Sequence, residues 1–205
     1  MNCPLCKHPG IPFDRDEYFQ CTHCSGLYKN INHYVSIKAE MSRYQEHNND
    51  VNDPRYQKFV SPITNYVLNH FTPNHSGLDF GSGTGPVASK VLQDQGYQIK
   101  QYDPLFAHDI SLLNETYDYI VSCEVIEHFH HPDVEFKLLY KMLKAQGALI
   151  CMTHLYQNQI PFKTWYYRND PTHVFIYRQE TIKFIAKFYE FKNFKIDNKL
   201  VVFEM

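Results

Sequence analysis

The sequence predicts an α/β protein built on a doubly wound, mostly parallel sheet, with a small cysteine-rich unit at its N-terminus. Two observations predict the sheet: apolar runs that alternate with amphipathic helical patterns after residue 76, and a glycine-rich turn between the first run and a helix. Four of the six cysteines lie in the first 24 residues and predict the N-terminal unit. We expect a cysteine-rich unit at 1–30, a linker with helices at 31–76 and the sheet domain at 77–205.

The composition narrows the classes of protein to consider. A chain of 205 residues fits one ordinary domain with a small appendage, and 43% hydrophobic against 20% charged residues allows a packed core. The net charge of −2 argues against binding nucleic acid by bulk charge. No apolar run approaches the roughly 18 residues that span a bilayer, and the N-terminus lacks signal-peptide features, so a cytoplasmic location is expected.

The N-terminal cysteines form two C-x2-C pairs, Cys3 with Cys6 and Cys21 with Cys24. Each pair can offer two thiolates, and together they complete a tetrahedral shell around zinc. A thioredoxin-like redox pair is the alternative, but it explains neither the doubling nor the absence of a βαβ context. We expect a structural Zn²⁺, because about 25 residues cannot bury enough apolar surface to fold without it.

The linker carries one amphipathic helical pattern. Asp53 and Pro54 provide a helix start, and apolar residues recur with helical spacing from Tyr56 to Val67. Pro62 interrupts this pattern, which predicts a kink or two short helices, the second capped by Ser61. Upstream, Tyr44 and His47 lie in a stretch rich in hydrogen-bonding groups and are secondary candidates for a pocket.

A glycine-rich turn follows the first apolar strand of the sheet domain, at Gly81-Ser82-Gly83-Thr84-Gly85. A strand, glycine turn and helix in this order bring a ligand close to bare backbone at a helix N-terminus. Pro86 stands where a dinucleotide fingerprint requires glycine or alanine, and the Lys-Ser/Thr of a P-loop is absent. Both nucleotide-binding motifs are therefore disfavoured.

Two aspartates indicate the chemistry of that ligand. Asp79, two residues before the first glycine, would repel a pyrophosphate but favour an ammonium group. Asp103 closes the next strand, 22 residues after Gly81, near the separation at which an acid meets ribose hydroxyls. S-adenosylmethionine has both an amino-acid head and a ribose, and it carries no phosphate.

These segments resemble the class I S-adenosylmethionine-dependent methyltransferases, in particular the branch that includes the quinone-biosynthesis enzymes. The resemblance runs from about residue 77 to the C-terminus, and its motifs are Leu78-Asp79-Phe80-Gly81-Ser82-Gly83-Thr84-Gly85, Tyr102-Asp103-Pro104 and the segment from Tyr117 to His128. It implies a Rossmann-like methyltransferase fold.

The resemblance also implies a cofactor site. In the family the glycine loop, here with Asp79 before it, lies against the methionine part of the cofactor, the aspartate after the second strand binds the ribose, and the turn after the fourth strand borders both cofactor and acceptor. The residues that match are Gly81, Ser82, Gly83 and Gly85, then Asp103 and Pro104, and finally Glu124, Val125 and Ile126.

The chain is shorter than that family where the third strand should lie. Only 14 residues, 104–117, separate Asp103 from the strand that begins near Asp118, too few for a helix, strand and helix. We expect a sheet trimmed around the third strand, with at most a short strand or extended piece near Ile110. Asp109 is the nearest substitute for the adenine-contacting acid usually found in the missing portion.

Two histidines are candidates for catalysis. His128, just after a central strand, could remove a proton from the acceptor, or it could simply hold its loop by hydrogen bonds. Its neighbours Glu127, His130 and His131 invite a metal interpretation, but they lack the i, i+4 spacing of a helical zinc site. His173 follows an aromatic loop that would wall the acceptor site, and family members carry a similar Asp-x-Thr-His-Val segment. Packing alone could also explain the loop.

The interpretation that best fits these patterns is an S-adenosylmethionine-dependent methyltransferase acting on oxygen or carbon of a small-molecule acceptor. Two alternatives stay open. One is an RNA methyltransferase whose cysteine-rich unit at 1–30, a zinc ribbon, contacts the nucleic acid. The other is a non-catalytic zinc-binding adaptor on a methyltransferase scaffold. The charge balance disfavours nucleic acid as a partner, and no membrane partner is expected.

Overall fold

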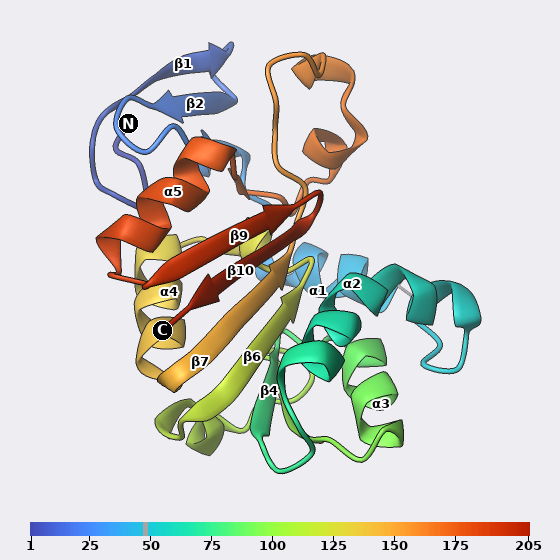
Figure 1. The fold of residues 1–205 in the computed structure, drawn as a ribbon. Helices are drawn as coiled ribbons and strands as arrows, with labels where there is room; N and C mark the ends of the chain where they lie inside the picture. Colours follow the sequence, from blue (N-terminus) through green and yellow to red (C-terminus); the bar gives the residue numbers. More distant parts are fainter. Residues whose placement is uncertain (47–48) are drawn as a thin grey trace.

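The computed structural model describes residues 1–46 and 49–205, so His47 lies outside the described residues. Two sheets organise the chain, and the larger has the strand order β5-β4-β6-β7-β10-β9 (Figure 1). Its strands are β4 (Ser76–Phe80), β5 (Gln98–Tyr102), β6 (Tyr117–Cys123), β7 (Leu143–Met152), β9 (Asn193–Asp197) and β10 (Leu200–Glu204). Strands β5, β4, β6 and β7 run parallel, and β10 is antiparallel to β7 and β9. This architecture confirms the predicted doubly wound, mostly parallel sheet.

Helices cover both faces of this sheet: α2 (Pro54–His70) and α3 (Val87–Asp94) on one side, α4 (Pro132–Lys141) and α5 (Gln179–Phe188) on the other (Figure 1). Successive residues of the central strands divide between the two faces, as the period of two requires. Leu149 packs in the core that includes residues of α4 and α5, whereas Ile150 packs in the core that includes residues of α2 and α3.

The helix α2 is continuous through Pro62, so of the two expected outcomes the break into two short helices is wrong, and a kink at Pro62 stays a prediction. Asp53 caps it as predicted, its side chain accepting from the Arg55 amide at 2.8 Å. Ser61 starts no second helix. The buried face at Ile63 and Val67 continues across the proline, and this burial outweighs the one backbone hydrogen bond that Pro62 cannot donate.

The sheet is trimmed as expected: β5 forms one edge, with no third parallel strand beyond it among the described residues. The segment at Ile110 is not extended, however. It forms the 3₁₀ helix η2 (Ile110–Asn114), and Asp109 caps it by accepting from the amide and hydroxyl of Ser111 at 3.0 and 2.6 Å. This local cap explains why the segment coils instead of extending.

The smaller sheet has the order β1-β2-β3-β8 and joins distant parts of the chain. Its first three strands, β1 (Gly10–Asp14), β2 (Tyr18–Cys21) and β3 (Leu27–Lys29), come from the N-terminal unit, which we call the ribbon (residues 1–30). The fourth strand, β8 (Phe175–Ile176), pairs with β3. The ribbon also shares a core with the large sheet, because Leu5 and Tyr28 belong to the same buried cluster as Leu149. Among the described residues, no helix is long and apolar enough to cross a membrane.

Candidate active site

The candidate site lies where the parallel strands β4, β6 and β7 end. Cys123 at the end of β6 lies opposite Met152 at the end of β7, and Asp79 near the end of β4 lies opposite Val121. The glycine loop follows β4, the turn at Glu124 follows β6, and a long segment, residues 153–174, follows β7. Open α/β sheets bind ligands at this edge.

Close approach and backbone conformation require glycine in the loop after β4. Gly81 has φ +82°, and a Cβ there would lie 2.6 Å from the Cγ atoms of Val125. The loop therefore touches the turn after β6, and the expected contact of Val125 with the cofactor stays a prediction. Gly83 has φ +63°, and no atom of residues 1–46 or 49–205 lies within 4 Å of where its Cβ would be, so no described side chain covers its backbone there. Ser82, between them, is buried.

Asp103 lies beside this loop. Its Oδ2 accepts a hydrogen bond from the Gly83 amide at 2.9 Å, and its Oδ1 accepts from the amides of Leu105 and Phe106 at 2.8 and 3.0 Å. The side chain is 8% exposed, and its neighbour Pro104 lies on the surface. The structure thus brings together the glycine loop and the second aspartate, as the spacing predicted.

Asp79 lies beneath the loop, with 3% exposure. Its Oδ2 accepts a hydrogen bond from the Ser89 hydroxyl of α3 at 2.7 Å. Burial raises the pKa of Asp79 to about 6, and the bond from Ser89 opposes that shift. The carboxylate thus ties the strand before the loop to the helix after it, and its contact with an ammonium group stays a prediction.

The turn after β6 carries a strained residue and an unpaired oxygen. Glu124 has φ +52°, a conformation that favours glycine, and its buried Oε1 has no hydrogen-bond partner among the described residues. Burial raises the pKa of Glu124 to about 7, an effect that Lys199 opposes. Ile126 is fully buried, so Glu124 and Val125 are the residues of this turn that can face ligands.

A buried polar cluster that the sequence did not indicate lies next to this turn. Glu127 is fully buried and accepts hydrogen bonds from Tyr167 Oη at 2.5 Å and Thr153 Oγ1 at 3.0 Å. Burial, and then the charge of Glu124, raise the pKa of Glu127 well above its usual value. Each partner lies far from Glu127 in the chain, and only the aromatic character of the loop around Tyr167 hinted at a role.

The two candidate histidines lie together, their ring centroids 4.7 Å apart. Nδ1 of His128 lies 3.1 Å from the Thr172 carbonyl, and Nδ1 of His173 lies 2.7 Å from the Tyr167 carbonyl. When Nδ1 donates to a carbonyl, the lone pair for accepting a proton is on Nε2. Burial lowers the pKa of His173, which keeps it neutral near pH 7. Of the secondary candidates, the Tyr44 ring lies edge-on to His128 at 5.3 Å.

The residues considered for a metal site after β6 do not all lie together, and a different set does. Potential ligand atoms of Glu127, His128 and His173 lie within 4.8 Å of one another, so two imidazoles and one carboxylate could hold a divalent cation. His130 instead packs against the Tyr34 ring at 4.7 Å, and His131 is exposed at the start of α4. The consecutive histidines therefore do not form one site.

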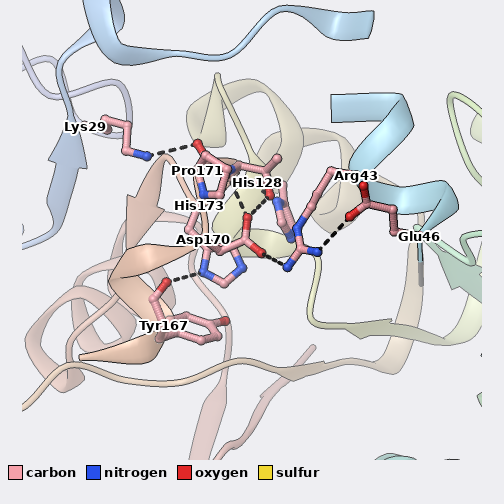
Figure 2. A network of polar contacts seen from close by, with 9 residues as sticks. Lys29, Arg43, Glu46, His128, Tyr167, Asp170, Pro171 and His173 are labelled. Carbon is pink, nitrogen blue, oxygen red and sulfur yellow. Dashed lines mark hydrogen bonds and ion pairs between the residues drawn. The ribbon is translucent and has the colours of Figure 1, made fainter. Parts of the chain in front are cut away.

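Asp170 anchors the segment that contains His173 (residues 165–174), which we call the acceptor loop after the role proposed for it below (Figure 2). Its carboxylate accepts from the amide and hydroxyl of Thr172 at 3.0 and 2.6 Å and from Arg43 of α1 (Ile37–Gln45) at 3.2 Å. Burial opposes ionisation, but Thr172, His173 and Arg43 outweigh it and lower the pKa of Asp170 to about 2. The helix α1 is thereby tied to the acceptor loop.

The four predicted metal ligands of the ribbon also come together. All four sulfur atoms lie within 4.8 Å of one another, with Cys3–Cys24 at 3.6 Å and Cys6–Cys21 at 3.3 Å. Tetrahedral zinc with Zn–S bonds of about 2.3 Å places sulfurs about 3.8 Å apart, whereas a disulfide holds them at about 2.05 Å. All four thiols are free, and their spacing fits zinc.

A mostly parallel sheet with a glycine turn after one central strand and an aspartate after the neighbouring strand fits the predicted class of S-adenosylmethionine-dependent methyltransferases. A family model described as a methyltransferase domain matches residues 44–196. The chain therefore belongs to this methyltransferase domain family, and the predicted class is confirmed. No curated protein matches the chain.

Solved structures share the fold at low sequence identity. Human N-acetylserotonin methyltransferase, in complex with S-adenosylmethionine, has a TM-score of 0.55 at 13% identity, covering 82% of this chain and 56% of that one. Phosphoethanolamine N-methyltransferase 2 of Haemonchus contortus has a TM-score of 0.55 at 17% identity, covering 79% and 44%. A methyltransferase of Archaeoglobus fulgidus has a TM-score of 0.53 at 18% identity, covering 73% and 94%. The chain spans about half the length of the first two proteins.

Proposed function

We propose that this protein transfers the methyl group of S-adenosylmethionine to an oxygen or carbon atom of a small molecule. The observation that carries the proposal is the hydrogen bond from Gly83 to Asp103, which places a carboxylate beside backbone that no side chain covers in the described part of the chain. A ribose needs such a carboxylate, and the adjoining methionine chain needs the close backbone approach. The Haemonchus enzyme was solved with phosphomonomethylethanolamine and S-adenosylhomocysteine, which supports a small acceptor here.

The residues around this backbone fit the cofactor. Gly81, Ser82, Gly83 and Gly85 would hold its methionine part, with Asp79 near the ammonium group, and Asp103 and Pro104 would hold the ribose. Glu124 and Val125 would border it from the turn after β6, and Val125 already touches Gly81. The bound cofactor would supply a methyl group attached to a positively charged sulfur, and the sulfur is a good leaving group.

The chain's own residues then have to align the acceptor and accept its proton. His128, which follows the turn after β6, and His173 of the acceptor loop have ring centroids 4.7 Å apart, and we assign both to the acceptor side. The acceptor oxygen or carbon would have to lose its proton as it takes the methyl group that the cofactor would supply, and His173 or His128 would accept that proton. The lowered pKa of His173 keeps its imidazole able to do so at neutral pH.

We also propose that Cys3, Cys6, Cys21 and Cys24 bind a structural zinc ion. Four thiolates complete a closed tetrahedral shell, so this ion would stabilise the ribbon and take no part in methyl transfer.

Calorimetry with S-adenosylmethionine tests the first proposal, and we expect a dissociation constant in the micromolar range. Transfer of a labelled methyl group should then be assayed with panels of phenols and sugars, and with RNA in parallel. Failure to bind the cofactor contradicts the proposal. Methyl transfer to RNA but to none of the small molecules would show that RNA is the acceptor. A protein that binds zinc but not the cofactor would favour the non-catalytic zinc-binding adaptor.

A further inference from the structure

The ribbon contacts the backbone of the acceptor loop on both sides of His173. Lys29 Nζ donates to the Pro171 carbonyl at 2.9 Å, and the Lys29 amide donates to the Val174 carbonyl at 2.9 Å. Between these two points, Tyr18 Oη donates to the carbonyl of His173 itself at 3.1 Å. Three hydrogen bonds from the ribbon, to the carbonyls of Pro171, His173 and Val174, thus hold one side of the acceptor loop.

An ion-pair cluster holds the other end of the same loop. Arg168 lies 3.1 Å from Asp14 of β1 and also pairs with Glu17 of the turn between β1 and β2. Its neighbour Tyr167 supplies the carbonyl that binds His173 Nδ1. The ribbon therefore restrains both the backbone of His173 and the group that orients its ring.

Lys29 is an unusual residue to find inside a small β-sheet. It is 4% exposed, and burying an ammonium group is costly unless hydrogen bonds compensate. Its ammonium lies over the Tyr18 ring, 5.5 Å from the centroid. Figure 2 shows the same ammonium reaching the Pro171 carbonyl of the acceptor loop. A lysine that served the ribbon alone could remain at the surface, so its contact with Pro171 accounts for its burial.

The cluster of four cysteines in the ribbon is linked to these contacts. The Cys21 amide donates to the Gly26 carbonyl at 2.9 Å, which shapes the turn that leads from Cys24 into β3. A Cβ on Gly26 would lie 2.5 Å from the ring of Phe175, the first residue of β8. The turn that carries two of the four cysteines thus packs against the residue two positions after His173.

We infer that the ribbon positions the acceptor loop, with Lys29 and Tyr18 as positioning residues that hold His173 at the acceptor side. The inference rests on the proposed function in assigning an acceptor to this loop. The part of the proposed cofactor site that the glycine loop and Asp103 form is separate, because neither of them makes any of these contacts, whereas the turn after β6 is bonded to the acceptor loop through Glu127. Loosening the ribbon should therefore disturb the acceptor loop and leave cofactor binding intact.

Trp165 provides a direct readout, because it is the only tryptophan of the chain and lies buried in the acceptor loop. The test uses the zinc-loaded protein and Lys29→Met, which keeps the aliphatic stem but removes the ammonium. We expect quenching of Trp165 by acrylamide to rise at least about twofold. The dissociation constant for S-adenosylmethionine should stay within about twofold. Lys163→Met is the matched control, since Lys163 is exposed on the neighbouring segment and should change neither value.

Tyr18→Phe is a milder second variant, which removes only the hydroxyl that binds the His173 carbonyl. Because the loosened loop admits water, we expect the pKa of His173, measured by NMR titration, to rise toward its ordinary value while zinc content is unchanged. If Lys29→Met fails to fold, this variant decides the outcome.

Unchanged quenching and an unchanged His173 titration in the folded variants would overturn the inference. A parallel loss of cofactor affinity would also overturn it, because the contacts would then serve the whole fold. These readouts need no acceptor. If wild-type protein fails to bind S-adenosylmethionine, the proposed function fails, while Trp165 and His173 still report on the ribbon.

Discussion

The hydroxyl of Tyr167 donates a hydrogen bond to the carboxylate of Glu127 at 2.5 Å, and both side chains are almost completely buried. The bond joins the acceptor loop to the turn after β6. Thr153 donates to the other carboxylate oxygen, so both oxygens are paired in a region that excludes water. Removing a partner from such a group leaves a desolvated acceptor without compensation.

Tyr167→Phe should therefore lower the free energy of unfolding by about 1–3 kcal/mol. Urea denaturation followed by circular dichroism measures this change. Tyr166→Phe is the matched control, because Tyr166 is 62% exposed and should lose no more than about 0.5 kcal/mol. Equal losses in the two variants would show that the buried bond contributes nothing specific.

The buried Asp79 predicts a pH dependence of stability. Its pKa is about 6 in the folded protein against 3.8 for the ordinary group, so between these values the folded state holds a proton that the unfolded state has lost. The free energy of unfolding should fall as pH rises through that window, by about 3 kcal/mol for this group. Asp79→Asn should flatten the decline and also weaken binding of S-adenosylmethionine, since the ammonium group loses its anionic partner.

Denaturation series for wild type and Asp79→Asn at about pH 4 and about pH 7 test this prediction. Glu124 and Glu127 add a decline of the same sign, so the informative quantity is the difference between the two proteins. Parallel curves would show that Asp79 titrates normally.

Local patterns predicted the first strand of the large sheet, its glycine turn and the helix after it, and they predicted that Asp103 closes the next strand, whereas the hydrogen bond from Gly83 to Asp103 was not itself predicted. A strand, a glycine turn and a helix are each encoded within a few residues, and parallel strands bring their carboxyl ends to one edge. The pairing of Cys123 with Met152 at that edge follows from the same rule.

The contacts that complete the acceptor side could not be predicted in this way. Strand β8 has only two residues and depends on β3, far away in the sequence, and Arg43 meets Asp170 from a separate helix. The hydrophobic periodicity of a sequence does not indicate contacts between residues so far apart in the chain. The two short helices expected at Pro62 did not form for a related reason, because burial of the flanking helical face outweighed a local breaker.

Loss of the ribbon's metal should destabilise the whole chain, because the ribbon shares a core with the large sheet. Replacing Cys21 and Cys24 with serine should release about one equivalent of zinc, measured by mass spectrometry of the metal, and should lower the melting temperature. Cys123→Ala, which removes a thiol outside the cluster, should keep the zinc. An unchanged metal content in the double variant would refute the four-thiolate site.

Asp103 carries the sharpest prediction for the cofactor. An ionised carboxylate offers about four acceptor positions, and three backbone amides use Asp103, which leaves capacity for a ribose hydroxyl. Asp103→Ala should weaken binding of S-adenosylmethionine at least tenfold, about 1.4 kcal/mol by calorimetry. Asp94→Ala, at the exposed end of α3, is the control for loss of an acid near the same elements. Because Asp103 also orders its own turn, Asp103→Asn, which keeps an acceptor oxygen, should retain the fold yet still bind more weakly. If both Asp103 variants bind S-adenosylmethionine with wild-type affinity, Asp103 does not bind the ribose.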